Sequence, residues 1–450
     1  MTQPLPQFPD GFCWGVATSA YQTEGSVTAG GREPSVWDTF CQRPGAIRDG
    51  RSGAVTTDSY RHWERDVAQL ARLGVTHYRF SIAWPRVQPG GRGPASKTGL
   101  DYYDRLTDGL LGAGITPVPT LFHWDLPQAL EDAGGWLARE TAHRFSDYAA
   151  LTAGRLTDRI ETWYTLNEPF VVTAYGYALG IHAPGRTLML DALPTAHHQL
   201  LGHGLAAAAL RAAGAARVGI ANNYSPAWAA TGDEEDVAAA EAFDLVQNWL
   251  FTDPILRGRY PDLSAFGLPD GMDCVRDGDL DVISAPLDAL GVNYYRPTRL
   301  SALPDSALPF QMEPVPGYPV TAFGWPVAPA ALSELLRQLA GRYGNSQPPI
   351  YITENGCSTD DRPTPCGAVD DQFRIDYLDA HLRALHTTIS EGIDVRGYFC
   401  WTLADNFEWS EGFTQRFGLV HVDHDTQART PKASYAWYRD VIADQRKAAP

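Results

Sequence analysis

The chain has 450 residues, of which 44% are hydrophobic and 20% charged, and its formal net charge is −17. These values are typical of a globular protein with a sizeable core, and the acidic balance argues against nucleic acid and anionic membranes as partners. The first residues show no signal-peptide pattern, and no run approaches the roughly 18 apolar residues of a membrane span.

Eight short strand-like stretches alternate with stretches of helical pattern along the chain. The strands are expected at residues 12–18, 76–82, 115–122, 160–166, 217–223, 287–295, 349–354 and 395–401. Helical patterns lie between them, for example over 61–73, 197–213, 330–343 and 372–392. Eight such alternations predict the α/β class, as a closed (β/α)8 TIM barrel rather than an open doubly wound sheet.

No linker or shift in composition divides the chain, so residues 1–450 are predicted to form a single (β/α)8 domain. Longer stretches at about 25–57, 178–195 and 300–326 are expected as loop insertions on the C-terminal face of the barrel. The six cysteines do not form a disulfide framework in a chain of this length. Cys357 and Cys366 bracket a loop, but a reducing cytoplasm, the expected location, argues against their pairing.

Polar or aromatic residues stand at the ends of most of the predicted strands. They are Gln22, His123, Asn167, Glu168, Asn293, Tyr295, Glu354 and Trp401. Because the active sites of such barrels are built from the C-terminal ends of the strands, these side chains are expected to form one site. A carboxylate at the end of a buried strand, such as Glu354, is unfavourable without a partner, which indicates a functional role.

Short motifs in a recognisable order run along nearly the whole chain. Residues 78–86 read Tyr-Arg-Phe-Ser-Ile-Ala-Trp-Pro-Arg, 123–127 His-Trp-Asp-Leu-Pro, 165–169 Thr-Leu-Asn-Glu-Pro, 352–356 Ile-Thr-Glu-Asn-Gly, and 405–409 Asp-Asn-Phe-Glu-Trp. Together they resemble glycoside hydrolase family 1, which contains retaining β-glucosidases and β-galactosidases. Each motif alone is weak, and the complete set in order carries the resemblance.

The resemblance implies that Glu354 is the catalytic nucleophile and Glu168 the general acid/base, with Arg79, Asn293 and Tyr295 in support. Retention of configuration needs two carboxyl groups about 5–5.5 Å apart, which strands from facing sides of a barrel can provide. The charge of Glu354 is expected to raise the pKa of Glu168, which keeps its proton at neutral pH. Arg79 is expected to keep Glu354 ionised.

The same resemblance assigns a set of substrate-binding residues. They are Gln22, His123, Trp124, Asn167, Trp325, Trp401, Glu408, Trp409 and Phe417. Members of the family that act on 6-phosphorylated sugars have a serine near position 408 and a nearby lysine, whereas Glu408 would repel a phosphate, so a free sugar is expected. The entrance on the leaving-group side is expected to include Trp163, Phe170, Val172, Tyr175, His182 and Phe323.

We therefore predict a retaining β-glucosidase that acts by double displacement on terminal β-D-glucosyl residues, with galactosides or fucosides as further substrates. The expected partners are small-molecule β-glucosides or short β-linked oligosaccharides, and no cofactor or metal is expected. Three alternatives stay open: a transglycosylating β-glycosidase, a 6-phospho-glycosidase, and a non-catalytic sugar-binding protein on the same scaffold. The sequence leaves the natural aglycone and the oligomeric state undetermined, a homo-oligomer included.

Overall fold

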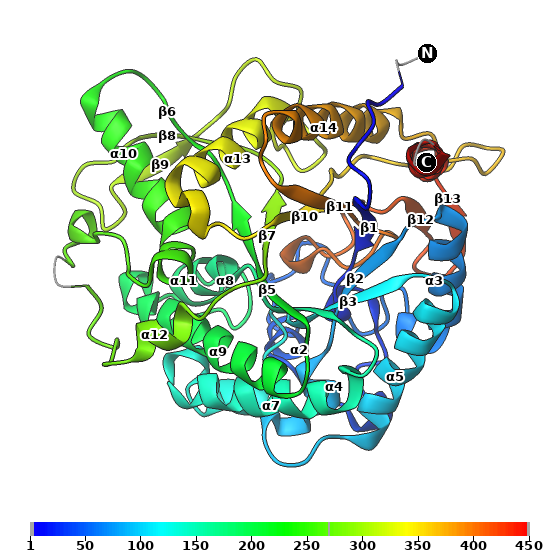
Figure 1. Ribbon diagram of the computed structural model, residues 1–450, viewed down its shortest axis with the longest axis horizontal. Helices are drawn as coiled ribbons and strands as arrows, with labels where there is room; N and C mark the ends of the chain where they lie inside the picture. The colour runs from blue at the N-terminus through cyan, green and yellow to red at the C-terminus, as the bar shows by residue number, and fades with distance from the viewer. Residues whose placement is uncertain (1–3, 269–270, 448–450) are drawn as a thin grey trace.

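The computed structural model describes residues 4–268 and 271–447, and its centre is a closed barrel of eight parallel strands. Around the barrel the strands follow the order β1, β11, β10, β7, β5, β4, β3 and β2 (Figure 1). They span Cys13–Ala17 (β1), His77–Ser81 (β2), Thr116–Phe122 (β3), Thr162–Asn167 (β4), Arg217–Tyr224 (β5), Ala289–Tyr294 (β7), Ile350–Asn355 (β10) and Val395–Trp401 (β11). The predicted (β/α)8 barrel is confirmed.

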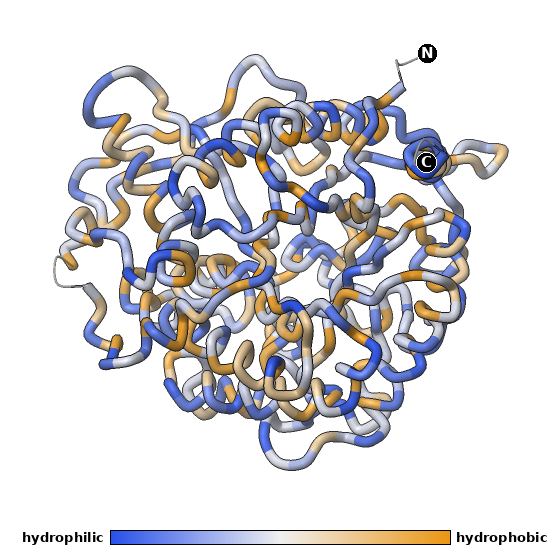
Figure 2. The backbone as a smooth tube through the Cα atoms, viewed as in Figure 1, coloured by the Kyte–Doolittle hydropathy of each residue, from blue (hydrophilic) through white to orange (hydrophobic). Residues whose placement is uncertain are grey.

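Helices surround the strands, as Figure 1 shows. The longer ones are α3 (Ser59–Leu73), α5 (Lys97–Gly112), α7 (Glu140–Leu156), α9 (Leu193–Ala212), α13 (Pro329–Tyr343), α14 (Gln372–Ser390) and α15 (Ala433–Lys447). Hydrophobic and hydrophilic segments alternate along most of these helices (Figure 2), because one side covers the barrel and the other faces solvent, whereas α9 is buried over most of its surface. None of the described helices is long and apolar enough to cross a membrane.

Helix α3 illustrates how the sequence produces this layer. Leu70 and Leu73 recur at helical spacing and are fully buried, whereas Arg72 lies on the exposed side. The helix ends at Gly74, whose φ of 80° lies in the left-handed region that glycine adopts without strain. The chain then enters β2 directly.

The interior of the barrel is filled by side chains of mixed size from several strands. This buried cluster consists of Ala17, Val118, Tyr164, Ala221, Ala289, Phe399, Trp401 and Phe417. Gly291 on β7 allows the close approach of its neighbours, because a Cβ there would lie 2.9 Å from the Cα of Ala221 and 2.8 Å from Oγ1 of Thr353. Because the interior is filled, a site must lie at an end of the barrel, and in barrels of this kind it lies at the carboxyl ends of the strands.

The predicted loop at 300–326 was partly wrong, because it contains regular structure. Strand β8 (Thr298–Ala302) pairs in parallel with β6 (Ala227–Ala229) and antiparallel with β9 (Phe310–Glu313), which gives a three-stranded sheet outside the barrel. Leu300 on β8 is fully buried in a small cluster with Phe243 of α10 (Glu234–Asp244). Leu300 is the one buried apolar residue of these three short strands, which is too weak a pattern to predict such a sheet.

Shorter elements lie around the mouth and rim of the barrel. They are α1 (Ala20–Thr23), α2 (Val36–Phe40), α4 (Trp84–Val87), α6 (Gln128–Asp132), α8 (Pro169–Val171), α11 (Asp253–Arg257), α12 (Asp279–Ile283), β12 (Val420–Val422) and β13 (Arg429–Pro431). Strands β12 and β13 form an antiparallel pair. All six cysteines are free, and Cys357 is buried whereas Cys366 is exposed.

Candidate active site

Two buried carboxylates lie at the carboxyl ends of strands on different sides of the barrel. Glu354 is the fifth residue of β10, and it pairs in register with Asn293 of β7. Glu168 directly follows β4, and its φ of 48° turns the chain from the strand into α8. The two side chains are 3% and 6% exposed, and both line the same large cavity.

Glu354 is held by a cation and a hydroxyl group. Nη1 of Arg79, on β2, lies 2.6 Å from one carboxylate oxygen, and the Tyr295 hydroxyl donates to the other at 2.8 Å. Burial raises the pKa of Glu354, and the Arg79 guanidinium and the Tyr295 hydroxyl oppose that rise. The net pKa of Glu354 lies above its ordinary value, because burial is the largest cause. Arg79 and Tyr295 limit that rise in the direction that the sequence analysis expected of Arg79.

Glu168 has a different set of partners. The amide Nδ2 of Asn293 donates to its Oε1 at 2.6 Å, and no cation forms an ion pair with it within the described chain. Burial, and after it the charge of Glu354, raises the pKa of Glu168 well above its ordinary value. The expected charge effect is present, but burial is the larger cause. Of the two groups, Glu168 is the one that keeps a proton at neutral pH.

The cavity that both carboxylates line has a volume of about 430 Å³. Most of the predicted substrate-binding side chains also line it: His123, Trp124, Trp325, Trp401, Glu408, Trp409 and Phe417. A cavity of this size accommodates a sugar together with part of a second group. Its aromatic walls provide the flat apolar faces that sugar rings use.

Two of the predicted substrate-binding residues lie one layer behind the cavity wall. Gln22 donates through Nε2 to Glu408 at 3.2 Å, and Nδ2 of Asn167 lies 3.0 Å from Nε2 of His123. Both side chains are fully buried and support residues that face the cavity. In this structure they therefore position Glu408 and His123 rather than line the space themselves.

Two titratable groups in the cavity wall, His123 and Glu408, are uncharged or weakly ionised near neutral pH. Burial and the charge of Arg79 lower the pKa of His123 well below its ordinary value, so the imidazole is neutral. Burial and the charge of Glu354 raise the pKa of Glu408 to about 8. These groups suit hydrogen bonds to hydroxyl groups better than an ion pair with a phosphate.

The structure brings some of the residues predicted for the leaving-group entrance to the cavity and leaves others away from it. Tyr175, His182 and Phe323 line the cavity as expected. Trp163, Phe170 and Val172 do not line it, and Trp163 is fully buried with its indole donating to the Ile160 carbonyl at 3.1 Å. Side chains alternate along a strand, so Trp163 faces the helices whereas Tyr164 faces the barrel interior.

Sequence reasoning missed two charged residues in the cavity wall, which are Glu411, paired with Arg48, and Arg296. Arg296 follows Tyr295 and lines the cavity beside Trp325. Arg296 belongs to none of the recognised motifs, and the only signal was its place next to Tyr295 after a predicted strand.

For metal binding, the described residues contain no group of three or more His, Cys, Asp or Glu side chains that could hold an ion.

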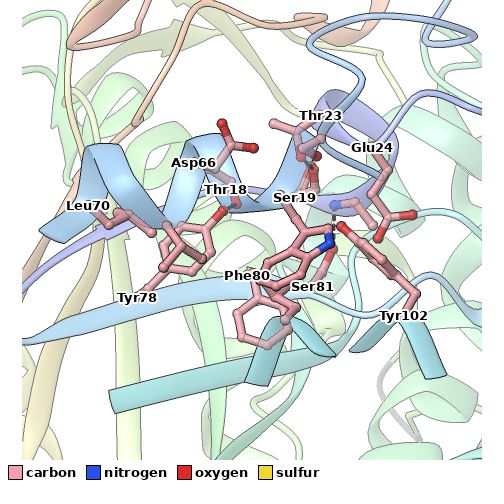
Figure 3. Close-up of a pocket in the computed structure, with 15 residues that line it drawn as sticks. Thr18, Ser19, Thr23, Glu24, Asp66, Leu70, Tyr78, Phe80, Ser81 and Tyr102 are labelled. Carbon is pink, nitrogen blue, oxygen red and sulfur yellow. Dashed lines mark hydrogen bonds between the residues drawn. The ribbon is translucent and has the colours of Figure 1, made fainter. Parts of the chain in front are cut away.

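A second cavity lies outside the barrel, between β2 and α3 (Figure 3). Tyr78, Phe80 and Ser81 contribute to it from the strand, and Asp66 and Leu70 from the helix. Its volume of about 20 Å³ is enough for a water molecule but not for a substrate. It does not compete with the large cavity as a candidate site.

Asp125 is a buried carboxylate without a hydrogen-bond partner for either oxygen in the described part of the chain. Burial raises its pKa to about 7. Since the unfolded value is near 3.8, the folded state holds the extra proton, and stability falls as the pH rises from about 4 to about 7.

We expect Asp125→Asn to remove this fall in stability with rising pH. The free energy of unfolding of the variant, relative to the original protein, should rise by roughly 2–4 kcal/mol between pH 4 and pH 8. Urea unfolding at several pH values measures it. A constant difference across that range would show that Asp125 is ionised in the folded state throughout.

The model of the family described as glycosyl hydrolase family 1 matches residues 5–447. The β-glucosidase of an Agrobacterium species is 44% identical over 446 residues, which cover 97% of this chain and 96% of that protein. A bifunctional β-D-glucosidase/β-D-fucosidase of Bifidobacterium breve is 44% identical over 461 residues, covering 97% and 98%. The crystal structure of a psychrophilic β-glucosidase from Micrococcus antarcticus superposes with a TM-score of 0.94 at 44% identity, covering 98% of each chain.

Proposed function

The chain belongs to glycosyl hydrolase family 1, and from this premise we propose that Glu354 is its nucleophile and Glu168 its general acid and base. The protein is a β-glucosidase that hydrolyses terminal β-D-glucosyl residues. The observation that carries the assignment of roles is the contrast between the carboxylates. Glu354 is paired with Arg79, whereas Glu168 is buried beside an amide and keeps its proton.

In the first proposed step, Glu168 gives its proton to the glycosidic oxygen while a carboxylate oxygen of Glu354 attacks the anomeric carbon. The bond between that carbon and the leaving oxygen breaks, and the aglycone departs as an alcohol. The sugar stays bound to Glu354 as an α-linked ester. Tyr295 and Arg79 stabilise the charged nucleophile before the attack, and they hold the orientation of its carboxylate.

In the second step, water resolves the ester. Glu168 is a carboxylate after it has given its proton to the aglycone. Because Glu354 is now esterified, its negative charge no longer raises the pKa of Glu168, so Glu168 stays ionised more easily and can accept a proton. It takes that proton from a water molecule, whose oxygen attacks the anomeric carbon from the face that the aglycone left. Two inversions give net retention, and β-glucose is the first product.

The part of the cavity wall formed by His123, Trp401, Glu408 and Trp409 is called the sugar-facing wall here. Its chemistry supports a free hexose as the bound group. The neutral His123 and the carboxyl group of Glu408 offer hydrogen bonds to hydroxyl groups, and Trp401 and Trp409 offer flat faces. A phosphate would face Glu408 rather than a cation. Because a relative with 44% identity is named a bifunctional β-D-glucosidase/β-D-fucosidase, we include β-D-fucosides as second substrates.

Trapping with a 2-deoxy-2-fluoro-β-glucoside tests the assignment. The fluorosugar slows both steps, so the ester should accumulate, and mass spectrometry of peptides should find the label on Glu354. Proton NMR during hydrolysis should show β-glucose before α-glucose. A label on another residue, or α-glucose first, would contradict the proposal.

Product ratios at high acceptor concentration measure how far transglycosylation competes with hydrolysis.

Replacing Tyr295 by Phe tests the hydrogen bond that the Tyr295 hydroxyl donates to Glu354. Loss of a hydrogen bond to a charged group is expected to lower kcat/KM by about 10- to 100-fold. The pKa of Glu354 should rise, because the Tyr295 hydroxyl lowers it in the original protein, and the acidic limb of the pH profile should move to higher pH.

Tyr294→Phe is the matched control for this variant, because that hydroxyl donates to the carbonyl of Ala328 and does not reach Glu354. An equal shift of the acidic limb in both variants would argue against the role of Tyr295.

We also propose that residues 1–450 act as one catalytic domain in the cytoplasm, and the six free cysteines support that location.

A further inference from the structure

Arg296 places a positive charge in the wall of the large cavity, on the side of the leaving group. Its guanidinium carbon lies 5.7 Å from the centre of the Trp325 ring, and the side chain is half-buried. The charges of Arg296 and Glu168 both act on the hydroxyl of Tyr175, which also lines the cavity. Because Glu168 faces the leaving oxygen, a group near Tyr175 and Trp325 belongs to the aglycone.

This guanidinium has no protein counter-ion. Within residues 4–268 and 271–447, no carboxylate forms an ion pair with Arg296, and no acceptor takes a hydrogen bond from its side chain. The carboxylates of the cavity have other partners: Glu354 with Arg79, Glu168 with Asn293, Glu408 with Gln22, and Glu411 with Arg48. A partly desolvated and unpaired cation is costly, so its position calls for a ligand.

The surroundings of Arg296 are flat and aromatic. The rings of Phe323 and Trp325 stack with their centres 4.3 Å apart and their planes 24° from parallel. The Tyr295 ring, whose hydroxyl donates to Glu354, lies 5.4 Å from the Trp325 ring. An aromatic wall therefore leads from the nucleophile to the cation.

We propose that the leaving-group side of the cavity binds a flat aglycone that carries a carboxylate, with that carboxylate paired to Arg296. The planar guanidinium forms two parallel hydrogen bonds with a carboxylate, while the body of the aglycone packs against Trp325 and Phe323. The proposal rests on the proposed function, because the aglycone lies here only if Glu168 faces the leaving oxygen. It adds an acidic substrate class to that function.

The net charge of −17 makes the preference informative. A strongly acidic protein repels an anionic substrate unless a local cation compensates. Without Arg296 the enzyme should therefore discriminate against acidic aglycones, and with it this discrimination should weaken or reverse.

The test uses aryl β-glucosides with a carboxylate in the ortho, meta or para position, each paired with its uncharged carboxamide. The readout is the ratio of kcat/KM for the carboxylate to kcat/KM for the carboxamide, because a general loss of activity cancels in it. In Arg296→Met, which keeps an apolar stem on Trp325, the ratio should fall about 10- to 100-fold for at least one isomer, mainly through KM. Arg296→Lys should restore part of it.

Arg299→Met is the matched control. Arg299 lies on β8 and donates to the carbonyl groups of Ala230 and Pro314, and it does not line the cavity. Its removal changes the net charge equally and should leave the ratio unaltered. Equal ratios for the original protein and Arg296→Met with every isomer would overturn the inference. Failure of the original protein to hydrolyse any of the uncharged glucosides would instead overturn the proposed function.

Discussion

Glu354→Gly is expected to lower kcat for aryl β-glucoside hydrolysis by about 10⁴-fold or more, because no other group can form the covalent intermediate. The glycine leaves a space beside Arg79 and Tyr295, both of which donate to the carboxylate in the original protein. Azide fits such a space and carries the same charge. Added azide should therefore restore turnover and attack the anomeric carbon from the nucleophile's face.

The product of that rescue identifies the role of Glu354. Direct displacement of a β-linked aglycone from this face inverts the configuration, so α-glucosyl azide is expected. Proton NMR distinguishes it from the β-anomer. Full activity without azide would show that Glu354 is not the nucleophile.

Glu168→Ala is expected to have the second largest effect, and its size should depend on the leaving group. For an alkyl glucoside or a disaccharide, loss of the general acid should lower kcat/KM by about 10²- to 10⁴-fold. For a dinitrophenyl glucoside, whose leaving group needs no proton, formation of the ester should remain fast. Glucosyl-enzyme should then accumulate, since no base activates water, and a burst of phenol should precede slow turnover.

The configuration of the glucosyl azide product distinguishes Glu168→Ala from Glu354→Gly. Here it attacks the ester on Glu354, which is a second inversion, so β-glucosyl azide is expected. The basic limb of the pH profile should also disappear, because it reports the proton of Glu168. Equal losses for all leaving groups would indicate a structural role for Glu168 and contradict its assignment.

The barrel and the two carboxylates could be predicted because each rests on a repeated local pattern. Each strand is a short apolar run, and polar residues such as Glu354 and Asn293 stand at the strand ends, where a parallel barrel gathers them. Tyr295 also stands at a predicted strand end, whereas Arg79 lies inside β2 and its role was implied by the resemblance to the family. The structure then supplied distances of 2.6 and 2.8 Å to the carboxylate.

The remaining features depend on packing between distant segments. The phase of β4 decides that Trp163 faces the helices, and a bend at the end of a strand can change this phase. Whether Gln22 lines the cavity or lies behind Glu408 and donates to it depends on how the segments around the cavity pack. The absence of a counter-ion for Arg296 is a property of everything that surrounds it within the described structure.

One guanidinium connects the two sides of the site. Arg79 donates to Glu354 at 2.6 Å and to Asn167 at 2.6 Å, and Asn167 lies 3.0 Å from His123 in the sugar-facing wall. A shift of that wall would therefore lengthen hydrogen bonds to the nucleophile. The site is preorganised: its geometry is fixed before the sugar arrives, so little binding energy is needed to align the reacting atoms.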